Sequence, residues 1–458
     1  MEIAETLVRA DDSGQLLPAL ASHFHVDSDY MTWRFKLREQ AIFHDGSAVT
    51  PQAIVQELER IRLRPAAALS RVPIASIRAE GDSIVIALTR PFALLPAYLA
   101  AGSSIILSPG SYGSNGALGA IFGSGPYRLA SIKDANNLEM RAVDDPSDHA
   151  IRTVHYMAVN DAETRARMLE AGNAHLIYNL SPAARERLRR NPAIRVVSTA
   201  GPRIRYVMVN TSDPRLADIN VRRALSLAMD RINAARILLR SPNVAASQMM
   251  PPILPDWTLP GGQMLMHDEE QANSLLEKAG WKREKGGVRQ KDGKRLSFTL
   301  NTYSMRPELP SLAEALQAQW KKVGVEVRIS LVTPDRILSD SRSGALELAL
   351  IARSYFVVPD LVGTLSEDFD SASPARGWGA VGWSSSEVND ALRRYENSTD
   401  ESVRETSRKV ILRIIHEELP ILPHSWFESV LAHSAALTNV SNNPFETSFS
   451  ISRMRWAS

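Results

Sequence analysis

Apolar and charged residues alternate strictly in residues 32–38, which is the pattern of a strand with one buried face. Trp33, Phe35 and Leu37 share one side of this segment, and basic residues occupy the positions between them. The alternation therefore predicts a half-buried β-strand close to the start of the chain.

A turn and a capped helix follow this strand. Asp45-Gly46 predicts a tight turn, because glycine accepts the positive φ that such a turn requires. Thr50 precedes Pro51, the arrangement of an N-cap residue and a proline in the first helical turn. The apolar residues that come next recur at helical spacing and predict an amphipathic helix: Ile54, Val55, Leu58 and Ile61.

Both periodicities recur along the rest of the chain, without an internal repeat. The predicted strands include residues 83–88, 138–141, 154–157, 175–178, 206–210, 296–300 and 325–331. The predicted helices are a segment that begins at Asp161 and residues 220–230, 269–280, 312–323, 386–397 and 401–418. Strand 296–300, helix 312–323 and strand 325–331 form a β-α-β unit, which predicts parallel strands covered by helices.

The composition is that of an ordinary globular protein with more than one folded unit. The chain has 458 residues, which exceeds a single ordinary core. Hydrophobic residues make up 44% and charged residues 23%. A net charge of +2, from 53 basic and 51 acidic residues without a basic block, gives nucleic-acid binding no electrostatic support.

Three features that the sequence lacks limit the kinds of site and of membrane association that we expect. The chain has no cysteine, which excludes disulfides, thiolate metal sites and cysteine nucleophiles. No window approaches 18 uninterrupted apolar residues, so we expect no membrane-spanning helix. Residues 1–8 contain neither a basic nor an apolar signal-peptide region, so no export signal is visible in this chain.

Motifs of common catalytic sites are also missing from the sequence. It contains no His-Glu-X-X-His pair, no Gly-X-Ser-X-Gly elbow and no Walker A loop. Gly123-X-Gly125 is too short for a dinucleotide-binding fingerprint. We therefore expect a protein that is not an enzyme and has no resident cofactor.

Five motifs, in the same order along the chain, resemble those of the peptide/nickel family of solute-binding proteins, the extracytoplasmic receptors of ABC importers. They are the strand, turn and helix of residues 31–61, Gly123–Tyr127, residues 209–231, Ala272–Trp281 and Gly382–Asn389. Each motif is weak alone, but the five together extend over nearly the whole chain.

The resemblance implies an α/β fold of the periplasmic-binding-protein type II, in the large cluster with an extra subdomain and with lobes joined by hinge strands. Lobe I is expected to comprise residues 1–208, with an inserted subdomain at about 40–165, and to be completed by residues 430–458. Lobe II then comprises residues 209–429. Such lobes close on a ligand, but the fold alone does not fix which ligand.

The resemblance also implies residues that bind carboxylates. In the nickel and metallophore receptors an arginine after the Gly-Pro-aromatic turn has this role, and Arg141 lies at the matching place. A guanidinium can grip a carboxylate with two parallel hydrogen bonds and keeps its charge. The metal-contacting histidine of the nickel receptors would fall near Ser373, where Arg376 is the closest charged residue. We therefore expect no direct metal ligand from the protein, and we expect Arg141 and Arg376 to hold the carboxylates of a chelator.

Residues of the second lobe complete the predicted site. Arg353, Tyr355 and Trp378 lie where these receptors present aromatic walls, which would pack against a flat or aliphatic part of the ligand. Asp360 matches the family's Pro-Asp pair, and in the dipeptide receptors a nearby aspartate pairs with the α-amine of the ligand. Burial in the lobe core, or a role at the start of a helix, is the structural alternative for these side chains.

The sequence thus predicts a monomeric periplasmic or extracytoplasmic receptor that captures a metal chelate, such as one of nickel, and presents it to an ABC-transporter permease. A short peptide is the alternative ligand. A cytosolic solute sensor or regulator with the same fold is a hypothesis from a different class, and an enzyme is the least favoured one.

Overall fold

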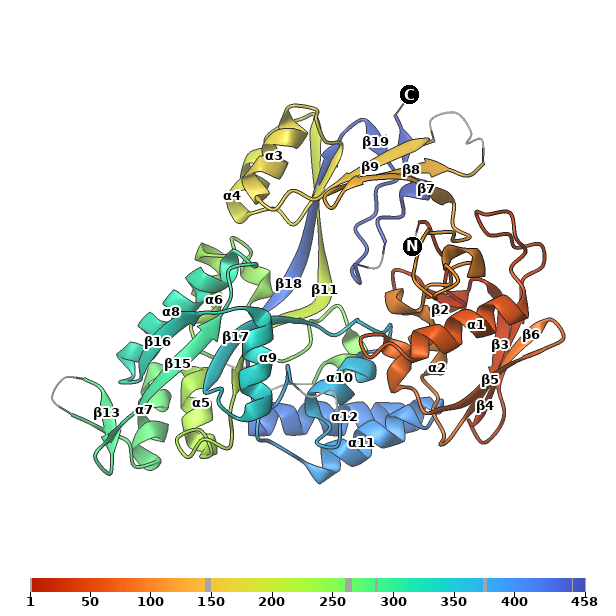
Figure 1. The fold of residues 1–458 in the computed structure, drawn as a ribbon. Coiled ribbons are helices and arrows are strands. Elements are labelled where there is room, and N and C mark those ends of the chain that lie inside the picture. Colours follow the sequence, from red (N-terminus) through yellow and green to blue (C-terminus); the bar gives the residue numbers. More distant parts are fainter. Residues whose placement is uncertain are drawn as a thin grey trace.

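Two long antiparallel strands, β11 (Ile194–Val209) and β18 (Ile421–Ser434), run through the middle of the molecule and connect its parts (Figure 1). The computed structural model describes residues 2–144, 150–259, 266–284, 287–373, 377–446 and 448–457. We call the ladder of β11 and β18 the hinge. Three groups of elements are arranged around it.

The upper lobe lies above the hinge in Figure 1 and holds an antiparallel three-stranded sheet with the order β7-β8-β9. Its elements are β7 (Tyr127–Asp134), β8 (Asn137–Ala142), β9 (Thr153–Met157), α3 (Ala162–Glu170), β10 (Leu176–Tyr178), α4 (Pro182–Leu188), β19 (Leu437–Thr438) and β20 (Arg455–Trp456). Strand β10 pairs with the upper half of β18, so the hinge continues into this lobe.

The N-terminal body lies to the right in Figure 1 and contains a four-stranded antiparallel sheet with the order β3-β4-β6-β5. Its elements are β1 (Val8–Ala10), β2 (Leu16–Pro18), β3 (Ala21–Val26), β4 (Thr32–Leu37), α1 (Pro51–Arg62), β5 (Ile74–Glu80), β6 (Ser83–Leu88) and α2 (Leu95–Ala100). The predicted alternation of β4 is confirmed, because Trp33, Phe35 and Leu37 are buried. Thr50 caps α1 as predicted by accepting a hydrogen bond from the Ala53 N–H.

The lower lobe continues the hinge ladder into a mixed sheet in which β11 pairs with β17 (Leu348–Ser354), and β15 (Ser297–Thr302) runs parallel to both β17 and β16 (Glu326–Leu331). Its helices are α5 (Ile219–Leu227), α6 (Arg231–Ile237), α7 (Glu269–Lys278), α8 (Glu308–Lys322), α9 (Pro334–Ser343), α10 (Leu361–Phe369), α11 (Ser386–Glu396) and α12 (Glu401–Glu418). A small sheet contains β12 (Lys282–Arg283), β13 (Arg289–Lys291) and β14 (Lys294–Arg295). The predicted β-α-β unit is confirmed as β15, α8 and β16.

Two helix boundaries differ from their predictions by three residues or more. Helix α8 begins at Glu308, four residues before the predicted start at Leu312, and so includes Pro310. Proline is tolerated in a first helical turn, because the N–H groups there have no partner within the helix. The helix predicted for residues 220–230 is α5, which ends at Leu227, and Asp230 instead accepts a hydrogen bond from the Asn233 N–H and caps the next helix, α6.

Backbone hydrogen bonds tie the N-terminal body to the upper lobe. Residues 2–8 accept from Gly125 N–H and Tyr127 N–H at the start of β7, and from Leu20 N–H in the N-terminal body. The predicted grouping of both parts into one lobe, with an inserted subdomain at about 40–165, stays a prediction. The exact boundaries at residues 208 and 430 stay a prediction. No helix among the described residues is long and apolar enough to cross a membrane.

Candidate ligand-binding cleft

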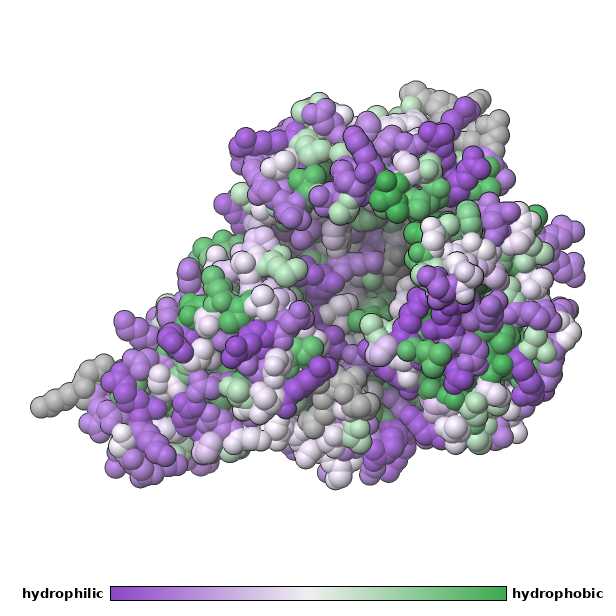
Figure 2. Space-filling view, in the orientation of Figure 1, coloured by the Kyte–Doolittle hydropathy of each residue, from purple (hydrophilic) through white to green (hydrophobic). Residues whose placement is uncertain are grey.

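A hollow lies in the middle of the molecule, with the upper lobe above it and the N-terminal body and lower lobe on its other sides (Figure 2). The parallel strands β15 and β17 end at the same edge of the lower sheet, and this edge meets the hinge where Tyr355 N–H donates to Pro202 O. Ligands of α/β sheets bind beyond the carboxyl ends of parallel strands. This edge is therefore the candidate binding cleft.

The hinge ladder is irregular at this edge. Gly201 pairs with Phe427, but the next pair is Ile204 with Trp426, so Pro202 and Arg203 form a bulge in β11. A side chain at Gly201 would place its Cβ only 2.6 Å from the Pro444 carbonyl oxygen. Glycine thus lets residues 441–446 of the C-terminal segment lie against the bulge.

Three arginines gather around the ring of Phe427, and we call them the arginine cluster. Their guanidinium carbons lie at these distances from the ring centre: Arg203 at 4.9 Å, Arg205 at 5.0 Å and Arg306 at 5.4 Å. Cations over an aromatic face are attracted by its negative potential. The cluster thus combines positive charge with an apolar surface at the floor of the cleft.

Two of these arginines have carboxylate partners. Arg205 is bound to Glu308 at 2.9 Å, with only 8% and 15% of the two side chains exposed. Burial of Glu308 opposes its ionisation, but the charge and hydrogen bond of Arg205, a backbone hydrogen bond and the charge of Arg306 together lower the pKa of Glu308 below its ordinary value. Arg203 pairs with Glu446 at 2.5 Å.

Arg306, the third arginine of the cluster, differs from the other two in its partners. Within the described parts of the chain, the guanidinium of Arg306 has no carboxylate within ion-pair distance, and Phe427 is its recorded contact. Helix α8 begins two residues later at Glu308, and its N-terminus has no side-chain cap. The positive end of the helix dipole adds to the charge of Arg306. This corner of the cleft is therefore suited to an incoming carboxylate.

The upper lobe reaches the cluster through Tyr178. Its hydroxyl donates to the Glu446 carboxylate, which also pairs with Arg203. Burial, followed by the charge of Glu446, raises the pKa of Tyr178 to about 12, so this hydroxyl keeps its proton at neutral pH. A chain of polar contacts thus runs from the upper lobe to the hinge bulge.

Three residues predicted from the sequence lie close to this edge but are engaged in the fold. Arg353 on β17 pairs with Asp368 at 2.9 Å and with Glu367 at 3.0 Å, and Tyr355 is fully buried. Asp360 caps α10, with its carboxylate accepting from Val362 N–H and from the Tyr395 hydroxyl.

The other predicted residues lie elsewhere. Trp378 is partly buried against the core, and its carbonyl accepts from the Tyr206 hydroxyl. Arg141 is on β8 in the upper sheet, where its side chain is 60% exposed and donates to Glu139 at 2.7 Å. Arg376 lies outside the described residues. The ligand-binding roles of all six residues stay predictions.

The sequence analysis missed the residues that the fold gathers here: Arg203, Arg306, Phe427 and Glu446. One local signal existed, because Gly201-Pro202 inside an otherwise apolar strand indicates a bulge or a close backbone approach. The other residues come from segments far apart in the chain. No periodicity connects them.

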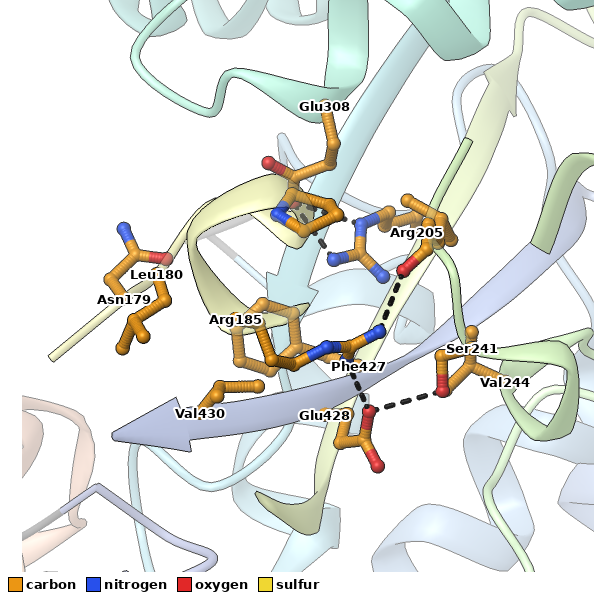
Figure 3. A pocket seen from close by; sticks show the side chains of 12 residues that line it. Asn179, Leu180, Arg185, Arg205, Ser241, Val244, Glu308, Phe427, Glu428 and Val430 are labelled. Atoms are coloured by element: carbon orange, nitrogen blue, oxygen red, sulfur yellow. Dashed lines mark hydrogen bonds and ion pairs between the residues drawn. The ribbon is translucent and has the colours of Figure 1, made fainter. Parts of the chain in front are cut away.

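A small cavity lies between α4 and the lower lobe, next to the arginine cluster, and Arg205, Phe427 and Glu308 also line it (Figure 3). Its volume is about 60 Å³, and the Arg185–Glu428 ion pair, at 3.0 Å, lies along it. This space holds a few water molecules and no larger guest. We therefore assign it to the packing of the two lobes beside the hinge.

The described side chains contain no group of three or more histidine, aspartate and glutamate residues that could hold a metal ion. Any metal in the cleft would need most of its ligands from elsewhere. The arrangement offers cations, an aromatic face and one carboxylate, which are groups suited to an anionic or zwitterionic organic guest.

Comparison with known proteins agrees with this geometry. The profile of the bacterial extracellular solute-binding proteins, family 5 Middle, matches residues 15–372. The dipeptide-binding protein DppE of Bacillus subtilis is 22% identical over 96% of this chain and 84% of its own length. The nickel-binding periplasmic protein of Escherichia coli is 23% identical, over 97% of this chain and 87% of its own length.

Solved structures show the same fold. NikA from Brucella suis, in complex with Fe(III)-EDTA, superposes with a TM-score of 0.90 at 22% identity and covers all of this chain and 94% of its own. AppA from Bacillus subtilis, in complex with a nonapeptide, gives 0.82 at 20% identity, with coverage of 100% and 93%. The predicted two-lobe α/β fold is thereby confirmed. The chain belongs to family 5 of the bacterial extracellular solute-binding proteins.

Proposed function

We propose that this chain is the solute-binding subunit of an ABC importer and that the arginine cluster holds a carboxylate of its guest. The observation that carries this proposal is Arg306, a cation without a carboxylate partner among the described residues, beside the uncapped N-terminus of α8. Charge-assisted hydrogen bonds between guanidinium and carboxylate are strong and geometrically specific.

The preferred guest is a metal chelate with several carboxylates, such as one of nickel. Two similar proteins support this class: the nickel-binding periplasmic protein of Escherichia coli and NikA bound to Fe(III)-EDTA. Since the described residues offer no three-ligand metal site, the chelator would supply the metal's ligands. Arg306 and Arg203 would then hold the chelator's carboxylates, with Arg141 and Arg376 as further candidate contacts.

A short peptide is the alternative guest. DppE and AppA, the latter in complex with a nonapeptide, are similar to this chain. Glu446 favours this class, because it places one carboxylate beside the arginine cluster and could receive an α-amine. Asp360, the sequence-based candidate for that role, is occupied as the cap of α10.

The remaining parts of the proposal concern where and how the receptor works. The family is described as extracellular, and we place this chain outside the cytoplasm on that basis. We propose a monomer that presents its closed form to a membrane permease and performs no catalysis. A solute sensor of the cytosol has no support from the contacts described above.

Calorimetry with the purified chain tests the proposal. We expect Fe(III)-EDTA and nickel–chelator complexes to bind, and Arg306→Ala to weaken that binding 10- to 100-fold, since a hydrogen bond to a charged group contributes roughly 1.5–3 kcal/mol. Arg328→Ala is the matched control, because Arg328 is exposed on β16 and lies far along the chain from the hinge.

Two results would overturn the assignment in different ways. Tight binding of peptides without any binding of chelates would reject the preferred guest but keep the cleft. Equal affinity of Arg306→Ala and the unchanged chain for every carboxylate guest would remove the arginine cluster from the site.

A further inference from the structure

The C-terminal segment brings a carboxylate of the chain itself into the arginine cluster. Glu446 faces Arg203 with both of its oxygens, since Oε2 lies 2.5 Å from Nη2 and Oε1 lies 3.2 Å from Nη1. A fork of two parallel hydrogen bonds is also how a free carboxylate binds a guanidinium. Glu446 therefore makes with Arg203 the contact that a carboxylate of the guest would make.

Side-chain hydrogen bonds hold the segment of residues 441–446 from two sides. Ser429 on β18 donates to the Asn442 amide oxygen at 3.0 Å, and the Asn442 amide nitrogen donates to the Ser429 carbonyl at 2.8 Å. Asn443 donates to Asp12, in the turn between β1 and β2, at 2.8 Å. The segment is thus fixed to the hinge and to the start of the chain just before Glu446.

The end of the segment is held in an unusual conformation. The ring of Phe445 stacks on that of Phe356, which follows β17, with ring centres 3.5 Å apart. The backbone of Glu446 has a φ of 57°, in the left-handed region that residues other than glycine seldom adopt. Such a conformation persists where the surrounding structure fixes it. The fold therefore places this carboxylate at Arg203 at a conformational cost.

The cluster contains two ion pairs, and Arg203–Glu446 is the one that is easier to exchange. Its side chains are 15% and 24% exposed, more than those of Arg205–Glu308. Glu446 also accepts a hydrogen bond from the Tyr178 hydroxyl. A guest that takes Arg203 therefore does not leave Glu446 without a partner.

Arg203 depends on having a carboxylate beside it. Burial lowers the pKa of Arg203, and the charges of Arg306 and Arg205 act in the same direction. The charge of Glu446 opposes them. A guest that displaces Glu446 must therefore supply a carboxylate in its place. Arg306 has no carboxylate partner among the described residues, so it accepts a guest without such an exchange.

We propose that Glu446 is a specificity-determining residue, a built-in carboxylate that reserves Arg203. A guest that presents one carboxylate binds at Arg306 and leaves Glu446 in place, whereas a guest that presents two must displace Glu446. Both guanidinium carbons lie within 5.4 Å of the centre of the Phe427 ring, so a small dicarboxylate can contact both arginines. This inference rests on the proposed function and adds that the cleft discriminates against a second carboxylate.

Glutarate and butyrate are the probes, because both are short aliphatic acids and they differ in having two carboxylates or one. Calorimetry at matched ionic strength gives the ratio of the glutarate affinity to the butyrate affinity. We expect this ratio to rise roughly tenfold in Glu446→Gln, since glutarate held at Arg306 then has its second carboxylate beside an unpaired guanidinium. Glu326→Gln, which alters an exposed pair with Arg295, is the matched control and should keep the ratio of the unchanged chain.

A second variant makes the test independent of one substitution. Glu446→Asp keeps the charge but is one methylene shorter, and we expect it to raise the ratio less than Glu446→Gln does. A ratio in Glu446→Gln equal to that of the control, or no binding of glutarate to it, would overturn the inference. Equal tightening of both probes would mean only that a repelling charge was lost, and would overturn it as well.

Arg306→Ala distinguishes a failure of this inference from a failure of the proposed function. Unchanged butyrate binding in Arg306→Ala would reject the proposed role of Arg306, whatever the ratio in Glu446→Gln. Weaker butyrate binding in Arg306→Ala, together with an unchanged ratio in Glu446→Gln, would keep the proposed function and reject the reservation of Arg203.

Discussion

The lobes touch each other in two places that are built differently. At the hinge, β11 and β18 share a backbone ladder from Ile194 to Met208, and the buried Arg205–Glu308 pair lies beside it. The second place is the mouth, which we define as the contacts of the N-terminal body with α10, α11 and the residues that follow α11. Its contacts are Arg71–Glu367, Arg90–Glu396 at 3.5 Å, Tyr30–Thr399 at 2.8 Å and Ala93 N–H to the Glu396 carbonyl at 2.6 Å.

This difference shows which contact can open. A ladder of backbone hydrogen bonds breaks only when the strands separate, and it keeps the two lobes in register. The mouth consists of partly buried side-chain pairs, the Ala93 backbone bond and apolar packing, since Tyr98 belongs to the same buried cluster as Leu361 and Val362 of α10. It has no strand ladder among the described residues, so we expect an opening motion to break the mouth and to leave the hinge intact.

Breaking the Arg205–Glu308 ion pair at the hinge should have the largest effect on the free energy of unfolding. Glu308→Gln leaves Arg205 buried without its carboxylate, and we expect the free energy of unfolding to fall by about 3 kcal/mol. Glu326→Gln is the control, because its pair with Arg295 is roughly half exposed and is worth about 0.5 kcal/mol or less. Urea denaturation measures both. A loss for Glu308→Gln no larger than for the control would contradict the rigid hinge.

Acid should weaken the hinge through His424, which is buried in β18 at the second irregularity of the ladder. Burial, followed by the charges of Arg231 and Arg205, lowers the pKa of His424 from 6.5 to about 3. The unfolded chain binds this proton below pH 6.5 and the folded chain does not, so stability is lost as pH falls. We expect a loss of about 2 kcal/mol between pH 7 and pH 5.

The measurement is denaturant unfolding at the two pH values for the unchanged chain, for His424→Asn and for the exposed control His23→Asn. His424→Asn should lose most of this pH dependence, whereas His23→Asn should keep it. The same pH dependence in all three proteins would show that His424 is not its source.

A substitution at the mouth should change the overall shape of the protein more than its free energy of unfolding. Arg71→Ala removes the contact with Glu367, which keeps its partner Arg353, so we expect a cost of about 1 kcal/mol to the closed form. The radius of gyration from X-ray scattering should rise in the absence of a guest. Arg34→Ala removes a pair inside the N-terminal body and should leave the radius unchanged. An equal rise in both variants would place the opening elsewhere.

The smallest effect on folding is expected at Arg141. Its side chain is 60% exposed, so Arg141→Ala should change the free energy of unfolding by no more than about 0.5 kcal/mol. A binding measurement on this variant then reports its contact with the guest alone. Weaker chelate binding would support the predicted contact with a carboxylate, and unchanged affinity would remove Arg141 from the site.

Local patterns predicted most of the elements of this fold. The alternation in β4 and the spacing in α12 were sufficient, because burial of one face dictates the period of apolar residues. The end of α5 at Leu227 was predicted three residues too late, since Asp230 is compatible both with the end of a helix and with the cap of the next one. The start of α8 was missed because Pro310 normally argues against a helix.

The site was much less accessible to sequence reasoning. Arg353 was expected where the second lobe presents its aromatic walls to a ligand, and in the structure Glu367 and Asp368 from the following helix engage its guanidinium. Arg203 and Arg306 meet only because the fold brings the hinge bulge next to the start of α8. Such proximity is a property of the tertiary fold and leaves no local periodicity to detect.

The carboxylate of Glu446 serves two neighbours at once. It accepts from the Tyr178 hydroxyl of the upper lobe, and it neutralises Arg203 beside the cleft. A solute that drew Arg203 away would leave Glu446 with Tyr178 alone, and a displacement of Tyr178 would change the pairing of Glu446 with Arg203. By thermodynamic reciprocity, the effect of the first change on the second would equal the effect of the second on the first.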